Sequence, residues 1–583
     1  MREMTLVIVD TVGVQKYIFN SNRLRENVGA SHLVHLASEG WLRQSPEIFF
    51  PKNRYYIQDE IDAKSPQTKA QMIEHSEDGQ GVLAELLYAG GGNTVLLFRR
   101  EADAKHFSQT LSRKLLCEAP GLNVVLVMEA FDWDEESLAK VMKNAHKKLA
   151  AKKSLREWSQ PLQGVSVSVN CFSTGQAAAL VESPITIETG DDPSVPISME
   201  VKAKWANNNP AKERLKTVLL KDVIEQSDAS QWVFPDEMSN QGRWRSDEPL
   251  VFPDDLDNLG RLEGDFSYVA VVHADGNSMG KYLEDWGEAF KTQKGDANRS
   301  YIQKMRHFSG AVRQAGLTAM AEVVKEVARW NGYEDYGSAP LIEPSLSHDR
   351  RQLKSSIFLS IRPIVYGGDD VTFICDGRIG LMAAQRFLQV FNQQKIPVFK
   401  DGHESEIHAV AAAGVAIVKV RYPFARAYGL SEALCKNAKD VFERKQPALD
   451  WRMSEESKES ETLDLQMRPL RIDNANLNVK LASTEQMDWH TWSNFTQLLH
   501  AFQDDDVWPR SKVMMLRDAL HKGSDDVRHF RLHYHSQRLL PAIDITGGGD
   551  YQETGWVGGD CVYFDAIEMI EQEVIMQGED DYE

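Results

Sequence analysis

The sequence predicts an α+β protein with two similar units of strands and helices, a connector between them and a helical region after them. Two observations carry this prediction. Short β-branched strands alternate with amphipathic helices in two separate stretches of the chain. In each stretch an early strand ends in an aspartate, Asp10 or Asp275, and a glycine-rich turn between two strands comes later.

The first unit is expected to span residues 1–182. It starts with a β-branched strand that runs into an amphipathic helix, and a pair of strands around a glycine turn follows. The predicted order is a strand at 5–10, a helix at 27–42, two strands within 88–98, a helix at 102–116, a strand at 122–129, a helix at 135–152 and a strand at 165–169.

Prolines, asparagines and polar loops predict a connector at 183–264 with one helical stretch at 211–226. Periodic order resumes in the second unit, which is expected at 265–462. Its predicted order is a strand at 268–275, a helix at 301–330, a strand, glycine turn and strand within 357–377, a strand at 408–420 and a helix at 431–444. A helical terminal domain is predicted at 463–583, with helices at 491–502, 510–521, 525–540 and 564–576.

Composition narrows the class of protein. The 583 residues carry a formal net charge of −20, which argues against a wholly basic nucleic-acid-binding surface. The five cysteines form no C-x-x-C pair, so we expect no zinc site or disulfide framework, and we expect these cysteines to be buried. No apolar run could span a membrane and no signal pattern is present, so we expect a cytoplasmic protein without a membrane partner.

The two glycine turns predict an internal repeat. When Gly92 is aligned with Asp369, the strand-terminal Asp10 and Asp275 precede them by 82 and 94 residues, a difference small enough for a helical insertion. Duplication followed by loss of the turn carboxylates from one copy would leave a catalytic second unit and a supporting first unit.

The second unit is predicted to gather three carboxylates, Asp275, Asp369 and Asp370, at one edge of its sheet. Such a cluster is costly unless divalent cations neutralise it, so the pattern predicts a metal site. Mg²⁺, or Mn²⁺ in its place, takes oxygen ligands and commonly keeps phosphate oxygens or waters. Two such ions could activate a ribose hydroxyl, stabilise charge on an α-phosphate and bind pyrophosphate. These three residues are therefore the predicted catalytic acids.

Small residues near the acids predict room for a triphosphate. Gly367 and Gly368 would let phosphate approach the backbone. The turn that starts at Gly276 is expected to open a helix whose free N–H groups face phosphate. Lys439, in a predicted helix, could add a cation for the β- or γ-phosphate.

Plain turns are the alternative explanation. Gly and Asp favour turns, so GGDD alone would indicate an ordinary hairpin, whereas the strand-terminal Asp275 and the partial repeat favour catalysis. For the turn from Gly90 to Asn93, a ligand-free hairpin and a second nucleotide seat fit the sequence equally well.

Five stretches of sequence follow one another in a characteristic order. They are DTVGVQKYIFNSNRLRENVGASHLV (10–34), YAGGGNTVLLF (88–98), VVHADGNSMGKYL (271–283), PIVYGGDDVTF (363–373), and AAAGVAIVKVRYPF with LCKNAK (within 411–439). As an ordered set they resemble the large polymerase-cyclase subunit of type III CRISPR effector complexes, a relative of the GGDEF cyclases. GGDD alone is weakly specific, but the set covers most of the chain.

The resemblance implies two ferredoxin-like palm domains that face each other with two ATP molecules between them. It implies metal binding by Asp275, Asp369, Asp370 and the carbonyl of Gly276. The implied nucleotide contacts are Gly276, Asn277, Ser278, Gly280, Gly367, Gly368 and Lys439, with Gly91, Gly92 and Asn93 for the second ATP.

The implied activity is the synthesis of cyclic oligoadenylate second messengers in antiviral defence, triggered by target RNA. The implied partners are sibling effector subunits and guide RNA, and the helical terminal domain is expected to touch a small helical subunit. Many members also carry a nuclease domain and a zinc-binding cysteine cluster. Here the first palm is expected to start at residue 5, so we expect a shortened form without DNA cleavage.

Other functions compete with this interpretation. A catalytically idle scaffold of a ribonucleoprotein would have no need for a repulsive carboxylate cluster. A template-directed polymerase would need a basic, aromatic-rich region for a template, and the sequence shows none. A stand-alone cyclase that makes another adenosine-containing messenger stays open. The favoured hypothesis is an enzyme that joins ATP molecules and releases pyrophosphate.

Overall fold

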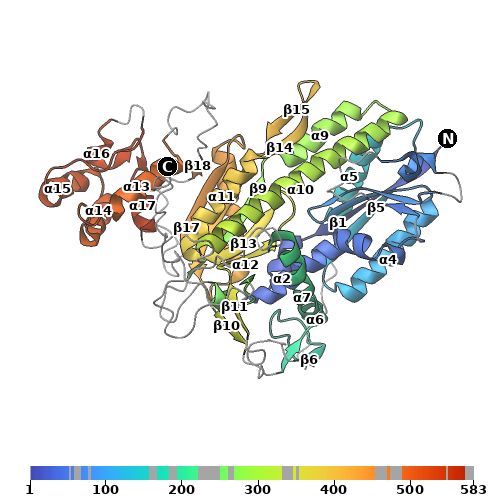
Figure 1. Cartoon of the computed structure of the whole chain (residues 1–583), viewed down its shortest axis with the longest axis horizontal. Coiled ribbons are helices and arrows are strands. Elements are labelled where there is room, and N and C mark those ends of the chain that lie inside the picture. Colours follow the sequence, from blue (N-terminus) through green and yellow to red (C-terminus); the bar gives the residue numbers. More distant parts are fainter. Residues whose placement is uncertain are drawn as a thin grey trace.

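The computed structural model describes residues 2–51, 54–57, 67–76, 81–155, 167–182, 194–220, 250–259, 268–330, 346–349, 354–453, 469–472, 489–545 and 549–570. Two large sheets form the body of the molecule, and a group of helices near the C-terminus lies beyond the second sheet (Figure 1). Among the helices of the described residues, none is long and apolar enough to cross a membrane.

The first sheet has five strands in the order β2-β3-β4-β1-β5. They are β1 (Glu3–Val12), β2 (Tyr55–Tyr56), β3 (Ala84–Gly90), β4 (Asn93–Phe98) and β5 (Asn123–Asp132). β1 is buried on both faces and pairs antiparallel with β4 and β5, as its continuous apolar run predicts. The β3-β4 hairpin carries the first glycine turn.

The second sheet has six strands in the order β12-β13-β9-β16-β17-β18. They are β9 (Tyr268–Gly276), β12 (Ile361–Val365), β13 (Val371–Asp376), β16 (Ala411–Lys419), β17 (Ala448–Met453) and β18 (Leu470–Arg471). The order β12-β13-β9-β16 matches β3-β4-β1-β5 of the first sheet, with a glycine-turn hairpin on the same side of the central strand. The predicted repeat is therefore confirmed in the topology.

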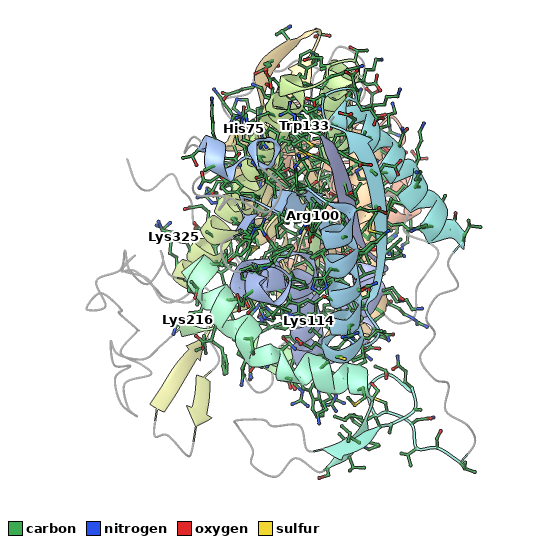
Figure 2. The ribbon with its side chains drawn as sticks, turned by 90° about the vertical axis from the view of Figure 1, so that its right-hand side faces the viewer. His75, Arg100, Lys114, Trp133, Lys216 and Lys325 are labelled. Atoms are coloured by element: carbon green, nitrogen blue, oxygen red, sulfur yellow. The ribbon has the colours of Figure 1, made fainter. Side chains whose placement is uncertain are left out.

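Helices cover both sheets and fill the space between them. They are α1 (Val14–Phe19), α2 (Leu24–His35), α3 (Trp41–Gln44), α4 (Glu101–Glu118), α5 (Leu138–Leu155), α6 (Met199–Ala206), α7 (Asn208–Leu215), α9 (Met279–Phe290), α10 (Asp296–Trp330), α11 (Gly380–Gln393) and α12 (Phe424–Val441), with π-helical turns η1 (Leu36–Gly40) and η6 (Lys216–Leu220). Figure 2 views the side on which α4 lies, where the Lys114 ammonium sits 4.8 Å from the centre of the Trp41 ring.

The two units share a hydrophobic core. Val9 of β1 belongs to the same cluster of buried side chains as Val271 of β9 and Ala416 of β16. The ring of Phe19 from α1 stacks on Tyr428 of α12 with centroids 4.1 Å apart. This common core holds the two sheets in a defined relation.

Helix α10, the longest at 35 residues, crosses from one core to the other. Near its start, Ile302 and Met305 pack with the first sheet. From Phe308 onward its buried side chains, among them Val312 and Ala319, pack with the second sheet. One rigid element therefore touches both units.

Smaller elements complete the chain. The C-terminal helices are α13 (Trp492–Gln503), α14 (Arg510–Lys522), α15 (Ser524–Tyr534), α16 (Tyr551–Thr554) and α17 (Phe564–Met569). The remaining strands form four small sheets: β6 (Leu180–Glu182) with β7 (Val195–Ile197), β8 (Leu250–Val251) with β10 (Leu346–Asp349) and β11 (Lys354–Phe358), β14 (Lys395–Lys400) with β15 (His403–His408), and β19 (Trp556–Val557) with β20 (Asp560–Cys561).

Several expectations need correction. The strand predicted at 165–169 is wrong for 167–169, where Val167 is 91% and Val169 64% exposed and no neighbouring strand covers them; 165–166 lie outside the described residues. Cys117 is exposed, because it falls outside the apolar stripe of α4, whereas the other four cysteines are buried and all five are free. The β14-β15 hairpin was missed, since β15 is polar and Pro397 interrupts the short apolar alternation of β14.

Other differences concern where elements end. The second sheet continues to Arg471, past the boundary predicted at residue 462, because β18 pairs with β17. The domain boundaries otherwise stay predictions. The ends of the helices predicted at 211–226 and 564–576 lie partly outside the described residues.

Candidate functional site

The ends of β9 and of the β12-β13 hairpin bring the predicted acids next to one another. The backbone N–H of Gly276 donates to the carbonyl of Asp369 at 3.1 Å. In the ladder Ala274 faces Val371, so Asp275 and Asp370 occupy the next facing positions. The fold therefore assembles the cluster that the sequence predicts.

The acids carry unbalanced negative charge. Burial, followed by the charges of Asp275 and Asp370, raises the pKa of Asp369 to about 7. Burial, followed by the charge of Asp275, also raises the pKa of Asp370 to about 7. The Asp370 side chain is 44% exposed, yet its Oδ1 is inaccessible and has no hydrogen-bond partner among the described residues. One oxygen of this carboxylate is thus sealed and the other faces outward.

Lys439 is the cation nearest to these acids. Its ammonium forms an ion pair with the Asp275 carboxylate and donates to the Gly276 carbonyl at 3.0 Å. Its side chain is only 5% exposed. These two acceptors are predicted metal ligands, so the ammonium holds the position expected for a metal ion rather than one expected for phosphate contact.

Gly414 explains how α12 delivers Lys439. A Cβ at Gly414 of β16 would lie 2.0 Å from the Ser431 carbonyl oxygen and 2.4 Å from the Cys435 nitrogen. The Cys435 thiol donates to the Ala412 carbonyl at 3.2 Å. The absence of a side chain therefore lets α12 lie directly on β16, beside β9, where its last turn reaches Asp275.

His273 and Tyr428 belong to this environment, although the sequence analysis did not single them out. His273 Nδ1 lies 3.6 Å from Asp370 Oδ1 and 3.3 Å from the Thr372 hydroxyl. Burial lowers the pKa of His273, so its ring is neutral at physiological pH. The Tyr428 ring meets it edge-on at 5.4 Å. The sequence could have indicated His273, because alternate residues of a strand lie on the same face of the sheet and His273 lies two residues before Asp275.

The loop after β9 offers polar groups that have no protein partner. Asn277 is 2% exposed, and both polar atoms of its amide lack a hydrogen-bond partner among the described residues. Ser278 has a left-handed backbone at φ 63° and precedes α9 without a side-chain cap. Gly280 is exposed, and a Cβ there would touch nothing within 4 Å. The buried amide and the uncapped helix start can therefore serve a ligand.

The two glycine turns differ in shape. In the first, Gly91 and Gly92 both have positive φ values, 58° and 81°, and form a two-residue hairpin turn. A Cβ at Gly92 would lie 2.2 Å from the Thr11 hydroxyl oxygen. In the second, residues 366–370 separate the strands, and a Cβ at Gly368 would meet nothing within 4 Å. Gly367 alone has a positive φ there, 105°.

Matching contacts extend the repeat into the first unit. The Thr11 N–H donates to the Gly92 carbonyl at 3.0 Å, as Gly276 does to Asp369. Asp10 faces Asn93 in the ladder and forms an ion pair with Lys153 of α5. This lysine, which the sequence analysis missed, is the counterpart of Lys439.

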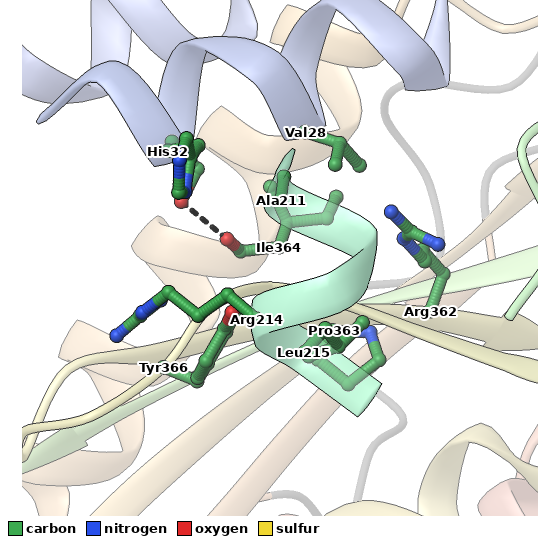
Figure 3. Close-up of a pocket in the computed structure, with 10 residues that line it drawn as sticks. Val28, His32, Ala211, Arg214, Leu215, Arg362, Pro363, Ile364 and Tyr366 are labelled. Atoms are coloured by element: carbon green, nitrogen blue, oxygen red, sulfur yellow. Dashed lines mark hydrogen bonds between the residues drawn. The ribbon is translucent and has the colours of Figure 1, made fainter. Parts of the chain in front are cut away.

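A small pocket lies beside β12, and none of the three acids lines it (Figure 3). Side chains of α2, α7 and β12 line it, and the Ser31 hydroxyl donates to the Ile364 carbonyl across one side. Arg362 is fully buried there, 3.9 Å from Asp254, and the Arg214 guanidinium lies 4.7 Å from the centre of the Tyr366 ring. The connector thus supports the strand that leads into the turn.

The donors suit a hard cation. Within the described residues, no group of three or more His, Cys, Asp and Glu side chains could hold a metal by itself. Mg²⁺ commonly needs only one or two carboxylates, with phosphate oxygens and waters completing its octahedron. The partly exposed carboxylate of Asp370 and the raised pKa of Asp369 fit such an ion.

Comparison with known proteins gives a family match for the second unit. The family described as Cas10/Cmr2, second palm domain, matches residues 268–448. None of the curated protein sequences matches the chain.

Several solved structures are similar to the chain. A Csm1-Csm4 cassette in complex with cA4 is 12% identical, with 98% of this chain and 70% of that chain covered and a TM-score of 0.46. The cassette in complex with cA3 is also 12% identical, with the same coverage and a TM-score of 0.44. A type III-B Cmr-beta structure in the apo state is 10% identical, with 98% and 81% covered and a TM-score of 0.45.

The family match covers the second unit from the start of β9 to the start of β17. It contains Asp275, Asp369, Asp370 and Lys439. The expected α+β palm architecture and the family resemblance are confirmed. Residues 268–448 of this chain match the second palm domain of the Cas10/Cmr2 family.

Proposed function

We propose that the chain is a metal-dependent nucleotidyltransferase that joins ATP molecules into cyclic oligoadenylates. The observation that carries the proposal is the cluster of Asp275, Asp369 and Asp370, whose charge only Lys439 offsets by direct contact in the described part of the chain. A palm of a known nucleotide-processing family that keeps such a repulsive cluster has a use for it.

In this proposal Asp275, Asp369, Asp370 and the Gly276 carbonyl hold Mg²⁺. When bound, the ion would supply charge stabilisation at the α-phosphate and lower the pKa of the attacking ribose hydroxyl. Lys439 would then be free to turn from Asp275 and the Gly276 carbonyl towards a phosphate oxygen.

The remaining groups would bind and orient the nucleotide. The Asn277 amide and the start of α9 donate to ligand oxygens, and the open turn at Gly367 and Gly368 admits the triphosphate. The first unit would seat the second ATP near Gly91, Gly92 and Asn93. Its Asp10–Lys153 pair provides one cation there.

The proposed setting is type III CRISPR defence. Sibling effector subunits and guide RNA would form the complex, and target RNA would trigger synthesis. This setting rests on the family of the second palm.

The test is incubation of the purified protein with ATP and Mg²⁺, with and without co-purifying subunits and RNA, followed by mass spectrometry of small products. Cyclic or linear adenylates and pyrophosphate are expected, and an Asp369→Ala, Asp370→Ala protein is expected to form none. A product that contains adenosine joined to another molecule would redirect the proposal to a different messenger. No product from the intact, RNA-triggered complex would favour the scaffold function.

A further inference from the structure

Three arginines on α10 connect the second palm to the first unit. Arg299, Arg306 and Arg313 are spaced by seven residues, which is close to two helical turns, so they share one face of the helix. All three bind carboxylates of the first unit, and all three carboxylates are buried. Buried charge pairs of this kind fix geometry, because breaking one leaves an uncompensated charge.

The first two arginines hold strand β3. Arg299 donates to both oxygens of Glu85 at 2.6 and 2.9 Å and to Glu74 at 2.8 Å. Arg306 donates to Glu85 at 2.8 Å and to the carbonyl of Leu86, which stands where the β3-β4 register shifts. Against the effect of burial, these contacts lower the pKa of Glu85 to about 2, so it stays charged. Trp133, labelled in Figure 2, lies 6.0 Å from the Arg299 guanidinium and marks this end of α10.

The third arginine holds the other side of the first glycine turn. Arg313 donates to both oxygens of Glu39 at 2.9 Å. Glu39 lies in the π-helical turn η1, where the carbonyl of Ser38 accepts from the Thr94 hydroxyl. Thr94 follows Asn93 directly at the first turn. Arg313 is thus linked to that turn through one intervening segment.

Three residues farther along, α10 touches the acidic turn. A Cβ at Gly316 would lie 1.9 Å from the Gly368 carbonyl oxygen and 3.0 Å from its carbon. Helix and turn backbones therefore meet with no side chain between them. A methyl group at this position must displace either the helix or the turn that carries Asp369.

We propose that α10 sets the spacing between the two glycine turns and that Gly316 and Arg313 are positioning residues of the reaction. The inference rests on the proposed function, since it assigns the helix the task of aligning two nucleotide seats. Gly316 locates the acidic turn, and Arg313 locates the first turn relative to it. Neither residue touches the reacting atoms.

The chain offers a matched control for Gly316. Gly310 lies on the same helix, and a Cβ there would meet nothing within 4 Å. Both Gly→Ala changes raise helix propensity, and they differ in the contact that the new methyl group makes with the turn. The expected result is that Gly316→Ala weakens Mn²⁺ binding, measured by electron paramagnetic resonance, and lowers kcat by roughly 100-fold. Gly310→Ala should match the wild-type protein in both.

A purely structural role would lower the thermal midpoint and leave Mn²⁺ affinity per folded molecule unchanged. Equal Mn²⁺ affinity and kcat in the two alanine variants would overturn the role of Gly316. If Gly316→Ala fails to fold, the Arg313→Lys variant tests whether α10 sets the spacing between the two turns. This variant keeps the charge but replaces the longer guanidinium, whose Nη1 donates to both oxygens of Glu39, so KM for ATP should rise while Mn²⁺ affinity stays the same.

The control for Arg313 is Arg329→Lys, because Arg329 contacts Glu326 within the same helix. If Arg313→Lys and Arg329→Lys have the same KM for ATP, the proposed coupling of the two turns through Arg313 is wrong. Failure of the proposed function can be told apart from failure of this inference, since the wild-type protein itself would then form no product. The Mn²⁺ measurement would still test Gly316 in that case.

Discussion

The two glycine turns occupy the same place in their sheets but differ in length, in packing and in the balance of charge around them. The first is a closed two-residue hairpin in which Gly92 lies against Thr11, and its single nearby acid, Asp10, is paired with Lys153. The second is longer and open, and three acids there share Lys439. A turn whose charges are balanced needs no ligand to be stable. A turn with excess negative charge is stabilised by a bound cation, and this difference supports the proposal that the second copy is the catalytic one.

The largest expected effect comes from the acids themselves. Asp369→Asn with Asp370→Asn removes the excess charge, so Mn²⁺ binding and product formation should fall by roughly 1000-fold, as loss of several kcal/mol of metal stabilisation implies. Titration of Mn²⁺ and product analysis check this. The matched change Asn93→Ala at the first turn should leave Mn²⁺ affinity intact. Equal losses of Mn²⁺ affinity and product formation in the two proteins would show that the two turns do not differ in metal binding.

The paired lysines come next. Lys439→Met removes the cation that contacts Asp275, so Mn²⁺ should bind about tenfold more tightly to the nucleotide-free protein, while product formation falls because phosphate loses a partner. Lys153→Met, at the first turn, should not change Mn²⁺ affinity. Weaker Mn²⁺ binding in the Lys439 variant would show that this lysine does not compete with the metal.

Glycine substitutions in the two turns should change the free energy of unfolding by different amounts. Gly92→Ala should lower the free energy of unfolding by about 1–3 kcal/mol, because φ there is 81° and the Cβ would strike Thr11. Gly368→Ala should be nearly neutral for folding, since its Cβ meets nothing. Urea unfolding of the two variants measures both values. A larger loss for the Gly368 variant would mean that the second turn is the tighter one.

A pH dependence of stability without metal also distinguishes the acidic turn from the first one. The folded pKa values of Asp369 and Asp370, about 7, exceed the unfolded values of about 4, so their contribution is present below pH ~4 and is lost as pH rises through about 7. In a chelator, the thermal midpoint should therefore fall over this range. Mg²⁺ should reduce the fall, and the double asparagine variant should lack this component.

The predictions from local sequence patterns were confirmed where the local pattern itself determines the secondary structure. The apolar run of β1 and the long periodic stretch of α10 are strand and helix because burial and periodicity act over neighbouring residues. The strand predicted at 165–169 was wrong over 167–169, because its alternating apolar side chains, Val167 and Val169, are exposed instead of buried against a strand of the described residues.

By itself, the sequence determined the two units, an aspartate near the end of β1 and of β9, and the turns that come later, since each depends on short-range rules for strands, helices and turns. Only the tertiary structure decided that Lys439 reaches Asp275, that Lys153 mirrors it, and that Gly316 touches the acidic turn. These contacts join residues far apart along the chain. They depend on how two sheets and one long helix pack in three dimensions, which no local pattern encodes.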